Sequence, residues 1–170
     1  MPKQEFTDAI ALLKHDHREV EDLFKKFQNA SGADRKWQIA QQICNELKIH
    51  AQIEEEIFYP AFQGKVDEDL YREAYVEHDG AKVLINDIME SGGQGEFFEA
   101  KVKVLSEEIE HHVEEEEKAK EGYFAQVRDS DIDLVALRDQ MLARKEELQA
   151  MVEAGGLPAA ELTAVNADAS

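Results

Sequence analysis

Apolar residues that recur at alternating steps of three and four are the feature that most restricts the fold of this 170-residue chain. In residues 6–27 they fall on one face of a helix, and later stretches repeat the pattern. The sequence predicts helices over about 7–29, 34–62, 68–90, 96–126 and 131–154. Short loops between helices of similar length favour an all-α fold, an up-and-down antiparallel four-helix bundle plus an extra C-terminal helix.

The chain length and a hydrophobic content of 43% suit one core. We expect the bundle to occupy residues 1–127. Residues 128–154 are expected to form a C-terminal helix that packs on the bundle or at a subunit interface. Residues 155–170 begin with Gly-Gly-Leu-Pro and continue without a periodic apolar face, which predicts a flexible tail.

Acidic residues outnumber basic ones, 38 to 19, and give a formal net charge of −19. This charge repels phosphate backbones and anionic lipids, so neither nucleic acid nor a membrane is an expected partner. No apolar run approaches the ~20 residues that span a bilayer. The first residues lack the pattern of a signal peptide, and the single Cys44 cannot form an internal disulfide, so we expect a cytoplasmic protein.

Each bundle helix places one histidine on its apolar face. The four histidines are His17, His50, His78 and His112. Glu54 and Glu116 follow the second and fourth histidine by four residues, about 6 Å further along the same face. Burying these groups without a cation would cost several kcal/mol per unpaired charge, and no lysine or arginine lies on the four faces.

Metal coordination removes this cost. The alternative is a structural scaffold in which the same side chains form a hydrogen-bonded network, since a lone histidine in a core usually has that role. Four histidines on four faces favour metal. The donors are too many for one tetrahedral zinc and too rich in nitrogen for magnesium or calcium. We therefore predict two first-row transition ions, iron or manganese, bridged by the carboxylates and with coordination positions left for a small ligand.

The chain resembles the hemerythrin-like proteins with an HHE cation-binding domain over roughly residues 8–127. The resemblance rests on the segments Lys14–Glu19, Leu47–Pro60, Glu77–His78 and His111–Glu117. It implies a four-helix bundle that holds two iron ions with an oxo or hydroxo bridge. The implied imidazole ligands are His17, His50, His78 and His112, and the implied bridging carboxylates are Glu54 and Glu116.

The chain differs at two positions from the pattern of the oxygen-carrying hemerythrins, which the resemblance makes the reference. Lys82 stands where those proteins have a fifth histidine, and Glu116 follows His112 by four residues where they have an aspartate at five. This pattern is similar to a four-histidine branch, in which one iron has a spare position. The expected function is to bind or process dioxygen, peroxide or nitric oxide, in oxidative or nitrosative stress or in oxygen sensing. The alternative is an iron sensor or iron-handling module without turnover.

Three further residues are candidates for an extra ligand or a hydrogen-bonding role beside the metals: Glu46, Tyr71 and Tyr75. Asp16 and the acids next to Glu54 and Glu116 are expected at the surface, and Tyr59 is expected to close the end of the bundle. A second copy of the chain is a candidate partner through the apolar stripe of the C-terminal helix.

Overall fold

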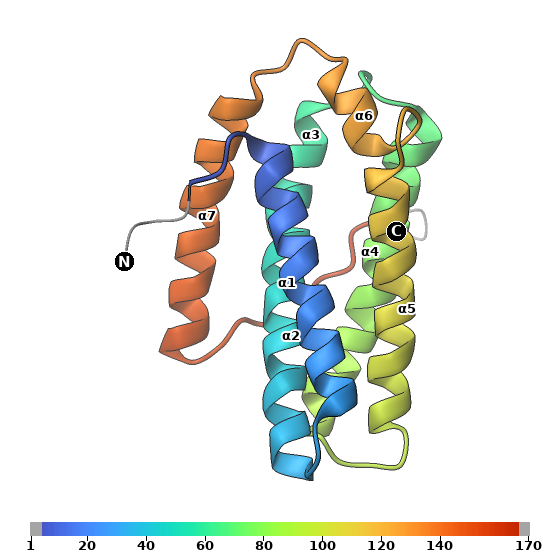
Figure 1. The fold of residues 1–170 in the computed structure, drawn as a ribbon, viewed down its shortest axis with the longest axis vertical. Helices are drawn as coiled ribbons and strands as arrows, with labels where there is room; N and C mark the ends of the chain where they lie inside the picture. Colours follow the sequence, from blue (N-terminus) through green and yellow to red (C-terminus); the bar gives the residue numbers. More distant parts are fainter. Residues whose placement is uncertain (1–4, 167–170) are drawn as a thin grey trace.

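The computed structural model describes residues 5–166 and shows an antiparallel bundle of four long helices with a fifth helix beside it (Figure 1). The bundle helices are α1 (Ala9–Asn29), α2 (Ala33–Ile53), α4 (Glu68–Ser91) and α5 (Phe98–Glu117). The other elements are the π-helix η1 (Glu54–Phe58), α3 (Tyr59–Ala61), α6 (Tyr123–Arg128) and α7 (Leu134–Ala154). No strand forms within residues 5–166, and the predicted all-α bundle with an extra C-terminal helix is confirmed. None of the helices described is both long and apolar enough to cross a membrane.

The apolar core falls into two clusters, one toward each end of the bundle. The first surrounds Leu13 and Phe58 and takes in side chains of α6 and α7. The second surrounds Val20 and Phe24 and reaches the far ends of α4 and α5. His17 lies between Leu13 and Val20 on α1, so the histidines form a polar layer between two apolar regions.

The second bundle helix widens at η1, where the sequence predicts a regular helix. The N–H of Tyr59 donates to the carbonyl of Glu54, five residues earlier, which is the spacing of a π-helix. Pro60 follows directly, and a proline disturbs the helical turn before it because it lacks an N–H and its ring clashes with that turn. The wider turn brings Tyr59 to the same side of the helix as Glu54.

The fourth bundle helix ends at Glu117, earlier than predicted, because the chain turns sharply between Lys118 and Gly122. The N–H of Gly122 donates to the carbonyl oxygen of Lys118 at 2.9 Å. A Cβ atom at this glycine would lie 2.5 Å from that oxygen, so the turn requires a residue without a side chain. α6 then folds back and buries Tyr123 and Phe124 against the end of the bundle.

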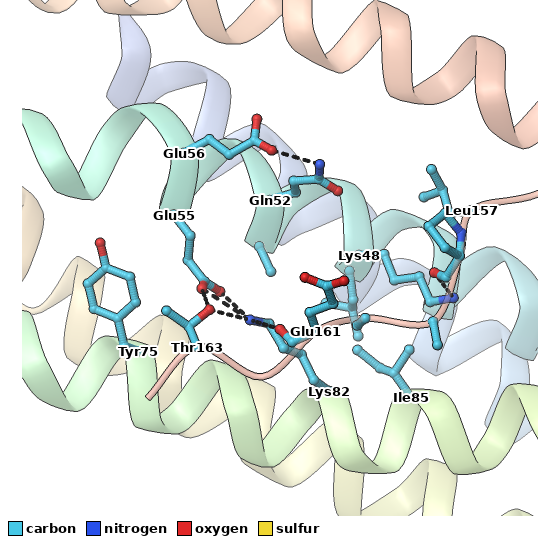
Figure 2. A pocket seen from close by; sticks show the side chains of 15 residues that line it. Lys48, Gln52, Glu55, Glu56, Tyr75, Lys82, Ile85, Leu157, Glu161 and Thr163 are labelled. Carbon is cyan, nitrogen blue, oxygen red and sulfur yellow. Dashed lines mark hydrogen bonds and ion pairs between the residues drawn. The ribbon is translucent and has the colours of Figure 1, made fainter. Parts of the chain in front are cut away.

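The C-terminal helix α7 packs on α1 and α2 within this chain and buries Leu137, Met141 and Leu148. Beyond it lies the segment for which the sequence predicts a flexible tail, residues 155–170. Residues 157–165 run across α2 and α4, because polar side chains of those helices bind the main chain of a segment that has no apolar face (Figure 2). The last part of the predicted tail, residues 167–170, lies outside the described residues.

Candidate metal centre

Six side chains on the apolar faces meet in the middle of the bundle, each with at most 8% of its surface exposed. They form two groups whose ligand atoms lie within 4.8 Å of one another. One group is His17, His50 and Glu116, and the other is Glu54, His78 and His112. Each group combines side chains from several helices, so both depend on the folded bundle.

The two carboxylates lie between the imidazoles. Glu54 Oε1 is 3.0 Å from Nε2 of His50 and 3.2 Å from Nε2 of His78. Glu116 Oε1 has the same relation to the remaining two histidines, at 3.2 and 3.3 Å. Each carboxylate therefore contacts one histidine from each group, which is the arrangement that a bridging ligand requires.

Several of these buried atoms approach one another but make no well-directed hydrogen bond among the described residues. They are Nε2 of His17 and His50, Oε1 of Glu116 and both carboxylate oxygens of Glu54. A buried polar atom left without a partner costs about 1–3 kcal/mol, and an ionised one costs more. These atoms belong to the two groups of candidate ligands, and a pair of metal cations between them would engage their lone pairs.

Each histidine is held at its outer nitrogen, Nδ1, by a carboxylate from the adjacent bundle helix. The pairs are His17 with Glu117 at 2.6 Å, His50 with Asp16 at 3.1 Å, His78 with Glu55 at 2.9 Å and His112 with Glu77 at 2.9 Å. We call these four acids the flanking carboxylates. A histidine that donates its Nδ1–H outward keeps an Nε2 lone pair directed inward, the tautomer that metal binding needs.

Three of the flanking carboxylates, Asp16, Glu55 and Glu117, were expected at the surface and are instead buried or half-buried. Asp16 has 6% of its surface exposed. Each flanking carboxylate is next in sequence to a residue of the cluster, so it is rotated about 100° around its helix and faces the neighbouring helix. The sequence contained a signal for this role: an acid stands directly beside a candidate ligand in each bundle helix. Metal-bound histidines usually need such an outer hydrogen-bond acceptor.

Three flanking carboxylates also contact a cation. The pairs are Glu117 with Arg18 at 2.6 Å, Asp16 with Lys145 of α7 at 2.6 Å and Glu55 with Lys82 at 2.9 Å. Lys82 occupies the position at which the sequence departs from the five-histidine pattern. Its ammonium group lies beside the carboxylate that holds His78, so it supports the cluster from outside.

Tyr59 reaches the cluster, although the sequence places it at the end of the bundle. Its hydroxyl donates to Oε2 of Glu116 at 2.8 Å and lies 3.2 Å from Nε2 of His112. The side chain is fully buried. The π-helical turn before Pro60 is responsible for this position, and the proline within a predicted helix was the sequence signal for it.

The three auxiliary candidates lie around the cluster, outside hydrogen-bond distance of it. The hydroxyls of Tyr71 and Tyr75 are 3.4 Å apart, and the ring of Tyr75 packs edge-on against Tyr59 with centroids 5.4 Å apart. Glu46 lines the cavity next to the histidines. Burial and the nearby negative charge of Glu19 raise the pKa of Glu46.

Without a metal, the cluster must hold its positive charge as protons. Burial lowers the pKa of His50, but the negative charge of Glu54 and the hydrogen bond with Asp16 outweigh it and raise the pKa to about 10. Burial raises the pKa of Glu116, yet the charged imidazole of His112 holds that pKa well below its usual range. These carboxylates therefore require adjacent positive charge, and two metal cations would supply it in place of the protons.

A cavity of about 30 Å³ lies next to the cluster, and we call it the inner cavity. Its walls include all four histidines of the cluster and apolar side chains such as Val20, Leu47, Ala51 and Ile85. The volume exceeds the about 10–15 Å³ that a cavity needs to hold one water molecule. A ligand of two or three atoms is therefore the size that the inner cavity accommodates.

Comparison with known proteins gives three findings. The family model of the hemerythrin HHE cation binding domain matches residues 8–120. A DNA nickase of Nostoc sp. is 28% identical over 119 residues, which make up 70% of this chain and 33% of that protein, so the chain spans a third of that relative. A crystal structure of a hemerythrin HHE cation binding domain-containing protein from Mycobacterium kansasii is 21% identical with a TM-score of 0.71, and the match covers 89% of this chain and 96% of that one. This last similarity is one of fold.

Proposed function

The chain belongs to the hemerythrin HHE cation-binding domain family, and we propose that it holds two iron ions that bind or process a small ligand. The observation that supports this proposal is the cluster of six buried side chains, in which each carboxylate touches one histidine of each group. Dioxygen, peroxide and nitric oxide are the ligand class, in a role in stress response or oxygen sensing.

In this proposal, the four Nε2 atoms and the carboxylates of Glu54 and Glu116 hold the metals, and the flanking carboxylates keep the imidazoles in the required tautomer. Six protein ligands for two ions leave coordination positions open. When bound, a pair of iron ions supplies those positions and one-electron redox chemistry for a small ligand. The nitrogen and carboxylate donors also suit manganese, so metal identity is part of the test.

Tyr59 is the protein group best placed to act on a ligand in the centre. Its O–H is directed at Oε2 of Glu116 and lies within 3.3 Å of Nε2 of His78. Burial and the negative charge of Glu116 raise its pKa, so it remains a neutral donor. We propose that this hydroxyl donates a hydrogen bond within the centre, and that the apolar walls of the inner cavity exclude water and larger molecules.

The first test is elemental analysis of untagged protein from iron-replete cells, where we expect about two irons per chain. The substitutions Glu54→Ala and His112→Ala should lose iron, because each removes an inward ligand. Glu107→Ala is the control, since Glu107 is an exposed residue on the same helix as His112, and it should keep both metals. A single zinc, or two irons retained in both ligand variants, would overturn the proposal.

Ligand chemistry is tested on the iron-loaded protein by mixing it with nitric oxide or hydrogen peroxide and following the absorption spectrum and the loss of the added compound. A spectral change at one equivalent without further consumption supports a binding or sensing role. Continued consumption supports turnover. The absence of both a spectral change and consumption would refute a small-ligand function, but it would not contradict the proposed metal centre.

A further inference from the structure

A second cavity, which we call the vestibule, lies between α2, α4 and the segment that follows α7 (Figure 2). Its volume is about 560 Å³. One wall is formed by residues 157–161 and Thr163, which belong to a segment over 157–165 that we call the strap. Glu55 and Tyr75 line the end of the vestibule nearest the metal centre. Glu55 contacts Nδ1 of His78, and the ring of Tyr75 packs against Tyr59.

The strap is held on the bundle mainly by hydrogen bonds. The fully buried carboxylate of Asp79 accepts three consecutive main-chain N–H groups, from Thr163 at 2.8 Å, Ala164 at 2.7 Å and Val165 at 2.6 Å. Most strap side chains are exposed, including Val165 at 43%. A segment that buries little apolar surface and depends on a few polar contacts can detach without unfolding the bundle.

Two further contacts fix the middle of the strap. The side-chain amide of Asn86 donates to the carbonyl of Ala160 and accepts its N–H, both at 2.9 Å. Lys82 donates to the carbonyl of Glu161 at 2.9 Å, and Figure 2 shows its ammonium group between the strap and Glu55. The strap is thereby attached to the same lysine that contacts a flanking carboxylate.

The vestibule and the inner cavity share a wall. Leu47, Ala51 and Ile85 line both cavities, so these apolar side chains separate the vestibule from the histidines. Ala51 is the smallest of the three and is half-buried. A fluctuation of the two larger side chains around this alanine would connect the cavities.

We propose that the vestibule is the route by which small uncharged molecules reach the metal centre, and that the strap controls access to it. The proposal rests on the proposed metal centre. An apolar partition admits an uncharged molecule at far lower cost than an ion, and the net charge of −19 further disfavours anions. A third cavity, of about 350 Å³, shares Asp16 and Glu46 with the inner cavity, but the ion pair of Asp16 and Lys145 stands in that path.

The first experiment measures the rate of nitric oxide binding to the iron-loaded protein by stopped-flow absorption. Ala51→Leu narrows the partition and should slow binding about tenfold, a barrier of about 1.4 kcal/mol. Asn86→Ala loosens the strap and should accelerate binding, as should a chain that ends after Gly156. Ala11→Leu on α1, at a half-buried alanine that lines neither cavity, is the control and should bind at the parental rate. Equal rates in all variants with equal iron content would overturn the route.

The second experiment needs no metal and separates a failure of the route from a failure of the proposed function. A cysteine is introduced as Ala51→Cys in a Cys44→Ala chain, and its reaction with methyl methanethiosulfonate is followed by mass spectrometry in the metal-free protein. Loosening the strap with Asn86→Ala should raise the labelling rate several-fold. An unchanged rate would show that the strap does not cover this path, whatever metal the protein binds.

Discussion

Replacing Glu54 by methionine distinguishes a metal centre from a structural network, because the two predict opposite effects on the metal-free protein. The Glu54 carboxylate is fully buried and neither oxygen has a hydrogen-bond partner among the described residues. Its negative charge is a main reason that the pKa of His50 reaches about 10. Once that charge is gone, the imidazole can lose its proton, so the substitution leaves no uncompensated charge in the core.

The magnitude follows from the cost of burying ions. Replacing a whole buried ion pair by apolar side chains of similar volume is neutral or stabilising by about 1–4 kcal/mol, whereas removing one partner while the other stays charged costs about 3–5 kcal/mol. Glu54→Met belongs with the first case only because His50 can become neutral. We expect metal-free Glu54→Met to unfold at or above the temperature of the metal-free parent. Each 1 kcal/mol moves the Tm of a domain of this size by about 2–4 °C.

The assay is thermal unfolding followed by circular dichroism, with and without added iron. The parent should gain stability with iron, and Glu54→Met should gain little because it lacks one of the six side chains proposed to hold the metals. Glu107→Met, an exposed glutamate on α5, is the control and should stay within about 0.5 kcal/mol of the parent in both conditions. If metal-free Glu54→Met loses 3–5 kcal/mol, the cluster is a hydrogen-bonded scaffold and the reasoning fails.

Three other outcomes follow from the structure. Asp16→Asn removes the charged acceptor at Nδ1 of His50, and chelator competition should show metal affinity reduced about 10–100-fold. Cys44 is 1% exposed and burial raises its pKa to about 12, so iodoacetamide at pH 8 should modify it only after unfolding, as mass spectrometry would show. Gly122→Ala sets a Cβ atom 2.5 Å from the Lys118 carbonyl and should cost about 1–3 kcal/mol in urea unfolding, and a smaller loss would show that the turn relaxes.

The apolar periodicity was sufficient to predict the bundle and to select the inward histidines. Residues at steps of three and four share one helix face whatever the tertiary structure, so His112 was separable from its neighbour His111, which is 64% exposed. The same periodicity could not place Tyr59, because one π-helical turn shifts the register of every residue after it. A proline inside the predicted helix marks such a place but does not say which way the register moves.

The roles of the flanking carboxylates and of the strap could not be predicted from the apolar periodicity, for a different reason. An acid at the edge of a helix face looks the same in sequence whether it meets solvent or an imidazole of the next helix, and only the packing of α1 against α2 directs Asp16 to His50. The strap has no periodic face, and its position depends on side chains far away in sequence, such as Asp79.

The region beyond the family match completes the environment of the centre. The match ends at residue 120, and the candidate ligands and flanking carboxylates all lie within it. Yet Lys145 of α7 binds Asp16 at 2.6 Å, and the hydroxyl of Thr163 in the strap donates to Glu55. One contact supports the carboxylate that holds His50, in the first ligand group, and the other supports the carboxylate that holds His78, in the second. The ammonium group of Lys145 and the hydroxyl of Thr163 each weaken the pull of a flanking carboxylate on the Nδ1 proton of its histidine. The C-terminal region can therefore adjust the donor strength of a histidine in each group without itself providing a candidate ligand.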